Sequence, residues 1–354
     1  MKLGVLKEIQ DPRVALVPTT IKKYQDLGLE ILVEHGAGNE SYFPDEEYKD
    51  ISFVDRPVVL SQSDIILAIS PPLDHELKTI QDKAILVGIY GQHKAYQSLS
   101  QYAFKVFSLD MIPRISLAQS MDVLSSMASL AGYRAVLLSA TSIPRYFPML
   151  TTAAGTIRPA KVLVLGAGVA GLQAIATAKR LGAIVEAFDV RKAAKEEVES
   201  LGGKFIEVEG AQDDTHAGGY AVQQSEAFLK RQRDEVQKRS ILSDVIITTA
   251  QVRGGKAPIL VPATTVNKMK KGAVIVDLAA ASGGNCELTI NNKTINHNGV
   301  TIIGDSHLAN GMAQDASTLL SNNFLNFMKF IISKGELELD YSHAMIEGAL
   351  ITKE

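Results

Sequence analysis

Three glycines spaced as Gly-x-Gly-x-x-Gly, namely Gly166, Gly168 and Gly171, follow the apolar run Lys161–Leu165, which is typical of a buried parallel strand. In this spacing the first glycine permits a tight turn, and the second lets the backbone approach a pyrophosphate. The third lets a helix pack closely on the strand. The helix predicted at 169–181 starts at this turn, so its unpaired N–H groups and the positive end of its dipole face the phosphates. The pattern indicates a dinucleotide-binding turn.

The residue after the next strand indicates which dinucleotide binds. Ala183–Phe188 is expected to form this strand, and Asp189 stands at its end, about 20 residues beyond the glycines. A carboxylate there holds both hydroxyls of the adenosine ribose and repels a 2′-phosphate, which favours NAD. Arg191 keeps the alternative open, because an arginine near this position accommodates NADP. The glycines alone could form a turn without a ligand, but a turn between two strands and before an acid favours a binding site.

The length and the patterning of the chain predict an α/β fold with two Rossmann-like domains and mostly parallel sheets. A chain of 354 residues suits two domains, and an apolar content of 46% suffices for two cores. Short apolar runs alternate with amphipathic segments over 1–112, and the pattern returns with the glycine motif over 161–305. Besides the two strands above, the expected strands are Lys2–Val5, Glu30–Glu34, Ile65–Ile69, Ala84–Gly88, Phe104–Ser108, Phe205–Val208, Val245–Thr248, Ala273–Asp277 and Thr301–Gly304. The expected shorter helices are Thr19–Leu27, Asp45–Asp50, Leu73–Ile80, Tyr96–Gln101 and Glu226–Arg239.

Two longer helical patterns, Ser120–Ala140 and Asp315–Ile332, are expected to link the domains. A C-terminal helix that returns to the first domain makes that domain discontinuous. We therefore expect a first domain of residues 1–133 plus 312–354 and a nucleotide-binding domain of residues 134–311. A cleft between them, at the carboxyl ends of the strands, is the expected place for the reactive end of the dinucleotide.

The composition excludes several other classes of protein. A net charge of −3 and an isoelectric point near 6.2 show no nucleic-acid footprint. The single cysteine fits a reducing compartment, and the seven histidines form no metal-binding motif, so no metal site is expected. The N-terminus does not read as a signal peptide, and we expect no membrane span.

A polar loop stands before the first long helix. Residues Pro113–Asp122 read PRISLAQSMD. Ser120 is a plausible N-cap, and Asp122 in the first turn would complement the helix dipole, which explains both by local structure alone. Arg114 has no such local role, and beside the nicotinamide it could bind the carboxamide, the ribose or a phosphate.

A second polar loop, Ala211–Gln223, contains glycines and Tyr220. Its composition favours an ordinary solvent-exposed loop over a closing lid with an aromatic tip.

Long stretches of the chain resemble one protein family. KEIQDPRVALVPTTIKKYQDLGLEILVEHGAG resembles both alanine dehydrogenase and the NAD(H)-binding subunit of proton-translocating NAD(P) transhydrogenase. More specific to the transhydrogenase are MIPRISLAQSMDVLSSMASLAGYRAV, LTTAAGTIRPAKVLVLGAGVAGLQAIATAKRLGA, FDVRKAAKEEVESLGGKFIEV, AGGYA, VDLAAASGGNCE and DASTLLSNNFLNF. Because the resemblance covers nearly the whole chain, the sequence is identified as a member of the alanine dehydrogenase and transhydrogenase family.

The resemblance implies roles for particular residues. Arg114, Gln119 and Asp122 match the hydride-transfer loop of that family. Ser125 matches a serine beside the nicotinamide, and Tyr220 matches the tyrosine of a loop that closes over the bound nucleotide, which favours the lid. The residues expected to bind the cofactor are Gly166, Gly168, Val169, Ala170, Gly171, Asp189, Val190, Arg191 and Ala250.

An alanine dehydrogenase-like amino-acid dehydrogenase is the first alternative. Ser70 stands where those enzymes use a lysine, and Ala281 where they use an aspartate, so groups needed for acid–base chemistry are missing. Their substrate arginine is retained as Arg13, whereas His93 aligns poorly with their histidine. The departures from the transhydrogenase pattern are Leu117, Ala281 and Arg253–Pro258.

Hydride transfer between two nicotinamide rings breaks one C–H bond and forms another, so it needs two rings held face to face rather than a general base. Arg114 and Ser125 are expected to orient the nicotinamide half of NAD(H), and Asp122 to fix the loop. Gln119 would face the partner's nucleotide, and Tyr220 would exclude water. The second alternative, a non-catalytic NAD-binding module, is disfavoured by the three polar residues of the loop.

A single nucleotide motif implies partner chains. We expect this chain to hold NAD(H), a second subunit to hold NADP(H), and a membrane-spanning subunit to couple the transfer to proton translocation. The resemblance also implies a cytoplasmic homodimer that reaches the inner membrane through its partner subunits.

Overall fold

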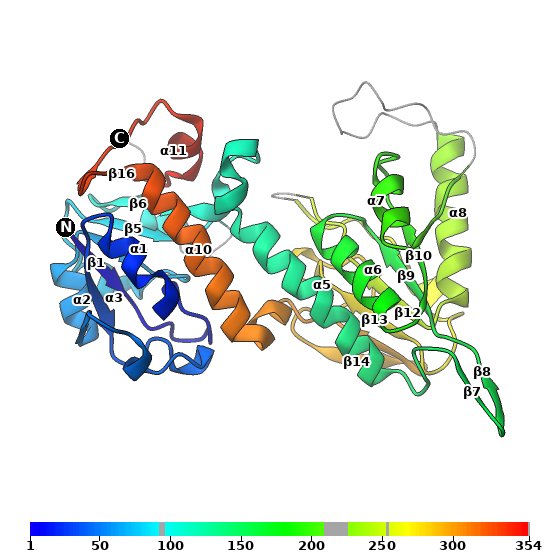
Figure 1. Cartoon of the computed structure of the whole chain (residues 1–354). Helices are drawn as coiled ribbons and strands as arrows, with labels where there is room; N and C mark the ends of the chain where they lie inside the picture. The colour runs from blue at the N-terminus through cyan, green and yellow to red at the C-terminus, as the bar shows by residue number, and fades with distance from the viewer. Residues whose placement is uncertain (92–95, 209–225, 253–254, 353–354) are drawn as a thin grey trace. The chain divides into compact units, whose positions relative to one another are not determined.

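The chain folds into two compact units. The computed structural model describes residues 1–91, 96–208, 226–252 and 255–352. One unit consists of Met1–Met127 and Asn310–Glu354, and the other of Ala128–Ala309 (Figure 1). The sequence placed the corresponding boundaries at 133/134 and 311/312. Each unit contains a mostly parallel sheet covered by helices, which confirms the predicted α/β class.

The sheet of the first unit has six parallel strands in the order β3-β2-β1-β4-β5-β6. This is the 3-2-1-4-5-6 order of doubly wound dinucleotide folds. Successive residues of a strand face opposite sides of a sheet, so Ile65 and Leu67 pack into one buried cluster and Ile66 into another. The strands are β1 Lys2–Val5, β2 Glu30–Glu34, β3 Ser52–Val54, β4 Ile65–Leu67, β5 Ile85–Gly88 and β6 Lys105–Ser108.

Helices from both ends of the chain cover this sheet. The long amphipathic helix α10 (Ala313–Ile331) buries Leu320, Phe324 and Phe327 in the cluster that contains Leu3 and Val5 of β1. Figure 1 shows α10, in orange, beside the blue N-terminal elements. The other helices of the unit are η1 Pro18–Thr20, α1 Ile21–Gln25, η2 Asn39–Ser41, η3 Asp45–Glu47, α2 Arg56–Gln62, α3 Asp74–Leu77, α4 Tyr96–Leu99, η4 Leu109–Met111, η5 Ser116–Met121 and α11 Ala344–Ala349. A short hairpin, β16 Ile332–Ser333 with β17 Glu336–Leu337, follows α10.

The sheet of the second unit repeats the same order and adds an antiparallel edge strand. The strand order is β11-β10-β9-β12-β13-β15-β14, and only β14 runs antiparallel to its neighbour. The strands are β9 Lys161–Leu165, β10 Ile184–Phe188, β11 Lys204–Phe205, β12 Val245–Thr248, β13 Val274–Asp277, β14 Thr294–His297 and β15 Val300–Ile303. The helices are α6 Val169–Arg180, α7 Ala194–Ser200, α8 Glu226–Leu242, α9 Ala263–Val266 and η6 Ala280–Ser282, and η7 Leu308–Met312 spans the boundary at which the chain returns to the first unit.

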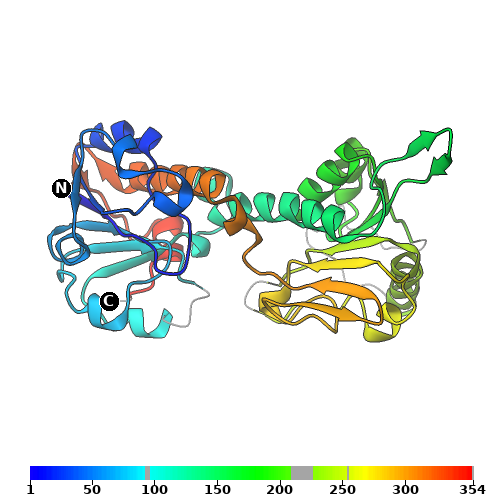
Figure 2. The same cartoon turned by 90° about the horizontal axis from the view of Figure 1, so that it is seen from below.

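A two-stranded hairpin of the second unit stands apart from its sheet. β7 (Leu150–Thr152) pairs antiparallel with β8 (Gly155–Ile157) and with no other strand among the described residues. Both views show it projecting from the unit (Figures 1 and 2). Nearly all its residues are exposed.

Several sequence predictions need correction. The first long helix, α5, spans Val123–Ser142, and the preceding residues Ser116–Met121 form a 3-10 helix, so the start predicted at Ser120 was wrong. The helix predicted at Asp45–Asp50 is a single 3-10 turn. The sequence analysis missed β3, α2 and the hairpin, because segments of three to seven residues carry little periodicity.

One helix departs from the expectation that the chain has no segment suited to span a membrane. Among the described residues, α5 is long and apolar enough to cross a membrane, by length and composition alone. A single helix of this kind is weak evidence, because a core helix passes the same test.

Candidate functional site

The glycine turn joins β9 to α6 in the second unit. Gly166 has a φ of +103°, a left-handed conformation that L side chains avoid, and its N–H donates to Phe188 O at 2.8 Å. Gly168 is the N-cap of α6 in an extended conformation, with no side chain that caps the helix. The N–H groups of the first helical turn are therefore available to an anion.

The other two glycines of the motif differ in what surrounds them. A Cβ on Gly171 would lie 1.9 Å from Gly166 O, so only glycine lets α6 pack this closely on the turn. A Cβ on Gly168 would meet no protein atom within 4 Å. The protein itself therefore does not require glycine at 168, and a ligand that approaches the backbone would.

Asp189 lies beside the turn, as its place after β10 predicts. Its Oδ2 accepts a hydrogen bond from Ala167 N at 2.7 Å, and its Oδ1 accepts from Arg191 N at 2.8 Å and from Arg191 Nε at 3.1 Å. This hydrogen bonding raises the pKa of the Arg191 guanidinium. The carboxylate thus supports the glycine turn and holds the Arg191 side chain beside it.

The exposed apolar side chains near the turn come from the residues predicted to contact cofactor. Val169, in the first turn of α6, is 44% exposed, and Val190, after β10, is 60% exposed. Val169 directly follows Gly168, and Val190 directly follows Asp189, so each is next to a residue predicted to bind the cofactor.

A buried polar network, which the sequence analysis missed, holds the strand end next to the turn. Asp277 is fully buried and accepts hydrogen bonds from Thr248 Oγ1, Ala279 N, Asn285 N, Cys286 N and Thr289 Oγ1 at 2.6 to 3.0 Å. Five donors satisfy the buried charge.

Asn285 extends this network to the strand end. Its side chain accepts from Ala250 N at 3.0 Å and donates to Ala250 O at 2.8 Å. Next to it, Thr249 Oγ1 donates to Gly166 O at 3.1 Å. The residues after β12 are therefore tied to the glycine turn at the switch point of the sheet, where doubly wound folds bind their ligands.

The polar loop Pro113–Asp122 belongs to the first unit. Arg114 and Gln119 are exposed, and Arg114 makes no hydrogen bond or ion pair with any residue that the structure describes. Asp122 is the N-cap of α5: its Oδ1 accepts from Ser125 N at 2.8 Å and its Oδ2 from Ser125 Oγ at 2.6 Å. The capping role therefore falls to Asp122, and the role assigned to Ser120 was wrong.

Some predicted residues cannot be placed. Tyr220 and His93 lie outside the described residues, as does Arg253. The predicted residues of the first unit (Arg114, Gln119, Asp122, Ser125) and those of the second form two groups, each brought together within its own unit.

The first unit has the same switch point as the second, but a carboxylate fills it. Glu8, which follows β1, is buried and accepts hydrogen bonds from Ile69 N at 2.6 Å and Ser70 N at 3.0 Å, across the gap between β1 and β4. These N–H groups are thereby unavailable to an anion. The sheet order alone therefore does not make this unit a nucleotide site.

Burial raises the pKa of the Glu8 carboxyl from 4.5 to about 7. The folded protein then binds a proton that the unfolded chain releases, so stability is expected to fall as pH rises from about 4.5 to about 7. This contribution amounts to about 3 kcal/mol at most, at about 1.4 kcal/mol per pKa unit. Chemical unfolding at several pH values is expected to show a smaller loss for Glu8→Gln than for the wild type. Equal slopes for both proteins would contradict this assignment.

Arg13, the retained arginine, already has a partner. Its Nε donates to Asp11 Oδ1 at 2.8 Å, a second guanidinium nitrogen pairs with Asp11 Oδ2, and Nη1 contacts Met127 Sδ at 3.1 Å. With its guanidinium engaged in this way, Arg13 is not positioned as a free anchor for a substrate carboxylate.

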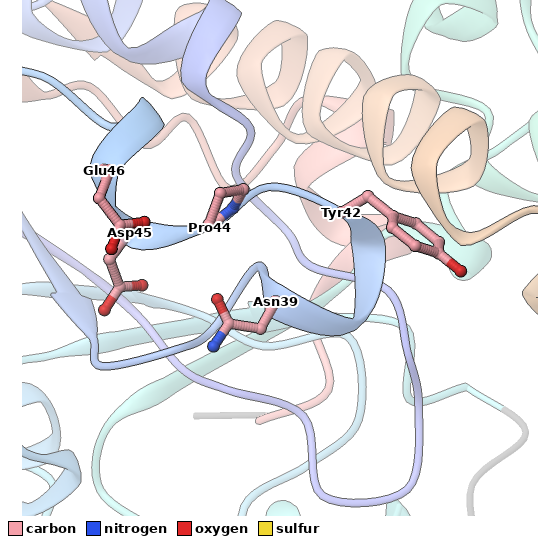
Figure 3. Close-up of a pocket in the computed structure, with 5 residues that line it drawn as sticks. All are labelled: Asn39, Tyr42, Pro44, Asp45 and Glu46. Carbon is pink, nitrogen blue, oxygen red and sulfur yellow. The ribbon is translucent and has the colours of Figure 1, made fainter.

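The first unit also has a shallow hollow. It is lined by Asn39, Tyr42, Pro44, Asp45 and Glu46 (Figure 3). Asp45 accepts hydrogen bonds from Gly36 N, which occupies part of its carboxylate. The described residues that line the hollow include no cationic side chain and no part of the Gly166–Gly171 turn, so we do not place the nucleotide there.

The geometry of the described residues defines a class: an α/β protein with a Gly-x-Gly-x-x-Gly turn at an uncapped helix N-terminus and, in its other unit, a loop of exposed polar residues. The chain matches the profiles described as "Alanine dehydrogenase/PNT, N-terminal domain" over residues 4–131 and "Alanine dehydrogenase/PNT, C-terminal domain" over residues 135–354. The chain therefore belongs to the alanine dehydrogenase/PNT family.

Within that family, the sequence identity of the chain is higher to several transhydrogenase alpha subunits than to alanine dehydrogenases. It is 42% identical over 371 residues to the first part of NAD(P) transhydrogenase subunit alpha of Rhodospirillum rubrum, covering 100% of this chain and 97% of that protein. The crystal structure of a transhydrogenase from Sinorhizobium meliloti matches with a TM-score of 0.90 at 37% identity, covering 99% and 98% of the two chains. An alanine dehydrogenase of Staphylococcus epidermidis is more distant, at 28% identity over 354 residues, covering 96% of this chain and 89% of that protein.

Proposed function

We propose that this chain is the NAD(H)-binding subunit of an NAD(P) transhydrogenase and takes part in direct hydride transfer. The similarity along the full length to transhydrogenase alpha subunits supports this role. The observation that carries it is that the backbone at Gly168 is open to a pyrophosphate and that Asp189 stands where such folds bind the adenosine ribose. A second, exposed loop bears Arg114 and Gln119.

Each group of residues has its own task in the proposed reaction. Bound NADH supplies the hydride from its reduced nicotinamide ring. The N–H groups of the first turn of α6 bind the pyrophosphate, and Asp189 binds the adenosine ribose. Arg114 and Ser125 orient the nicotinamide half, and Gln119 faces the nucleotide of the partner. Tyr220 belongs to this proposal as a residue that excludes water.

The charge at position 189 is proposed to select NAD over NADP, because a 2′-phosphate would meet the carboxylate. Asp189→Asn keeps oxygen and shape but removes the charge, while Arg191 remains. Calorimetric titration is expected to show that the ratio of the NADPH to NADH dissociation constants falls about tenfold or more, which is about 1.4 kcal/mol. Arg191→Ala removes the cation that could accept a 2′-phosphate, so it should instead raise this ratio. An unchanged ratio in Asp189→Asn would show that selectivity lies elsewhere.

The partners are part of the same proposal. A second subunit binds NADP(H), and a membrane-spanning subunit couples hydride transfer to proton translocation. The present chain then lies on the cytoplasmic side of the inner membrane, attached through these subunits.

The hairpin β7–β8 supports a homodimer. An isolated two-stranded hairpin is barely stable in water, yet this one projects from its unit with Ile157 42% exposed and the preceding Met149 65% exposed. A second copy of the chain would cover these side chains. Sedimentation of the purified chain is expected to give the mass of a dimer, and a monomer at micromolar concentration would contradict the proposal.

The function itself is tested by mixing the purified chain with an NADP(H)-binding transhydrogenase subunit. With NADH as the hydride donor, reduction of an NAD analogue with a distinct absorbance should require both proteins and bound NADP(H). Oxidation of NADH with pyruvate and ammonia, without the second protein, would instead establish the amino-acid dehydrogenase alternative.

A further inference from the structure

The loop Pro113–Asp122 is fixed at its C-terminal end by two amides of α10. Asn323 Nδ2 donates to Ser120 O at 2.9 Å, and Asn326 Nδ2 donates to the same oxygen at 3.1 Å. A carbonyl oxygen has two lone pairs, so these donors saturate it. Figure 1 shows α10 running beside the first turns of α5, which continue from this loop.

Asn323 is itself held in one orientation. It is 6% exposed, and its Oδ1 accepts a hydrogen bond from Ser126 Oγ at 2.8 Å. With its oxygen engaged by Ser126, its NH₂ group must face Ser120. The contact joins residues about 200 positions apart in the chain, so it is specific to the folded first unit.

The other end of the loop rests on α11. A Cβ on Gly348 would lie 2.6 Å from Pro113 Cδ and 3.4 Å from Met111 O, so the helix backbone touches the start of the loop. Three residues after Gly348, Ile351 donates from its N–H to Val106 O of β6 at 2.8 Å. The C-terminal segment therefore supports the strand and the turn that precede Arg114.

Between these fixed ends the loop presents its polar side chains outward. Ala118 and Met121 are buried and anchor the 3-10 helix in the core of the first unit. Arg114 and Gln119 are exposed. A short loop with two fixed ends and two buried anchors keeps its remaining side chains in a narrow range of positions.

We propose that Asn323 and Asn326 are positioning residues that hold the Arg114–Gln119 segment in the geometry needed for hydride transfer, without contributing to NADH binding. This inference rests on the proposed function. It assigns a role in reaction geometry to α10, whose buried apolar side chains pack in the core of the first unit.

The test compares three neighbouring asparagines of α10 in the reconstituted transfer assay. Asn323→Ala and Asn326→Ala each remove a donor to Ser120. Asn322→Ala is the matched control, because Asn322 donates only to Thr318 O of its own helix, at 2.8 Å. We expect the transfer rate to fall about 10- to 100-fold in Asn323→Ala, since small displacements of reacting groups have effects of this size. The more exposed Asn326→Ala should show a smaller loss in the same direction.

Two further readouts separate positioning from a general structural role. The dissociation constant of NADH should stay within about twofold of the wild type, because the glycine turn belongs to the other unit. Asn323→Asp places a carboxylate against Ser120 O, and burial raises the pKa of such a group. Its rate relative to the wild type should therefore rise as pH falls from about 8 to about 6, when the protonated acid becomes a donor.

The outcomes test the positioning role and the proposed function separately. Wild-type rates in Asn323→Ala and Asn326→Ala, or NADH affinity lost in parallel with rate, would overturn the positioning role alone. Absence of transfer by the wild-type chain would overturn the proposed function and this inference with it.

Discussion

Replacing Gly168 with alanine is expected to weaken NADH binding at least about tenfold, and replacing it with valine about 100-fold or more, without loss of stability. The backbone at Gly168 has a φ of −77° and a ψ of −168°, which every residue adopts easily. A Cβ there meets no protein atom within 4 Å, so the free protein has room for it. The side chain would instead occupy the space through which a pyrophosphate approaches the backbone. Titration calorimetry measures the affinity, and thermal unfolding measures the stability.

Gly171→Ala provides the contrasting control. Its Cβ would overlap Gly166 O at 1.9 Å, so this substitution should destabilise the free protein by about 1 to 3 kcal/mol. A Gly168 variant that loses as much stability as Gly171→Ala would show that the protein itself needs glycine at position 168. A Gly168 variant that binds NADH normally would contradict the placement of the pyrophosphate at this turn.

Arg114→Ala is expected to lower the rate of hydride transfer about 100-fold in the assembled system, while NADH affinity falls less than tenfold. The side chain has no partner among the described residues, so its removal should not disturb the fold. Its proposed role is to orient the nicotinamide half, and misorientation affects the rate more than the binding. Arg114→Lys should recover little, because an ammonium lacks the planar fork of donors. Rapid-mixing kinetics with the NADP(H)-binding subunit measures the rate.

Arg180→Ala is the matched control for this substitution. Arg180 is exposed in the last turn of α6 and makes no contact with either group of site residues that the structure describes. It should leave rate and affinity unchanged. If Arg114→Ala behaved like Arg180→Ala, the hydride-transfer role of the loop would be wrong.

The sequence predicted best those features that one short segment determines. The glycine spacing specified the turn between β9 and α6, because Gly166 needs a positive φ and Gly171 leaves no room for a Cβ, whereas Gly168 leaves the backbone open to a ligand. The acid after β10 was likewise placed by its distance along the chain. The central strands were recognisable because parallel strands buried on both faces form continuous apolar runs.

The features that were missed depend on contacts between distant residues. Asn323 supports Ser120 only after the C-terminal helix folds back onto the first unit, and no local pattern marks it. Glu8 reads as an ordinary surface carboxylate in sequence, yet it fills the switch point of its sheet. The start of α5 was misplaced because Ser120 and Asp122 are both good capping residues, and the 3-10 turn before the helix decides between them.

Isotope transfer tests the central claim most directly. The chain is mixed with an NADP(H)-binding transhydrogenase subunit carrying NADP⁺, and NADH deuterated at the transferred position of C4 is added. Direct transfer predicts that deuterium appears in NADPH, that none enters the solvent, and that both proteins are required. Bound NADH that yields no labelled NADPH, or deuterium found in water, would contradict direct hydride transfer by this chain.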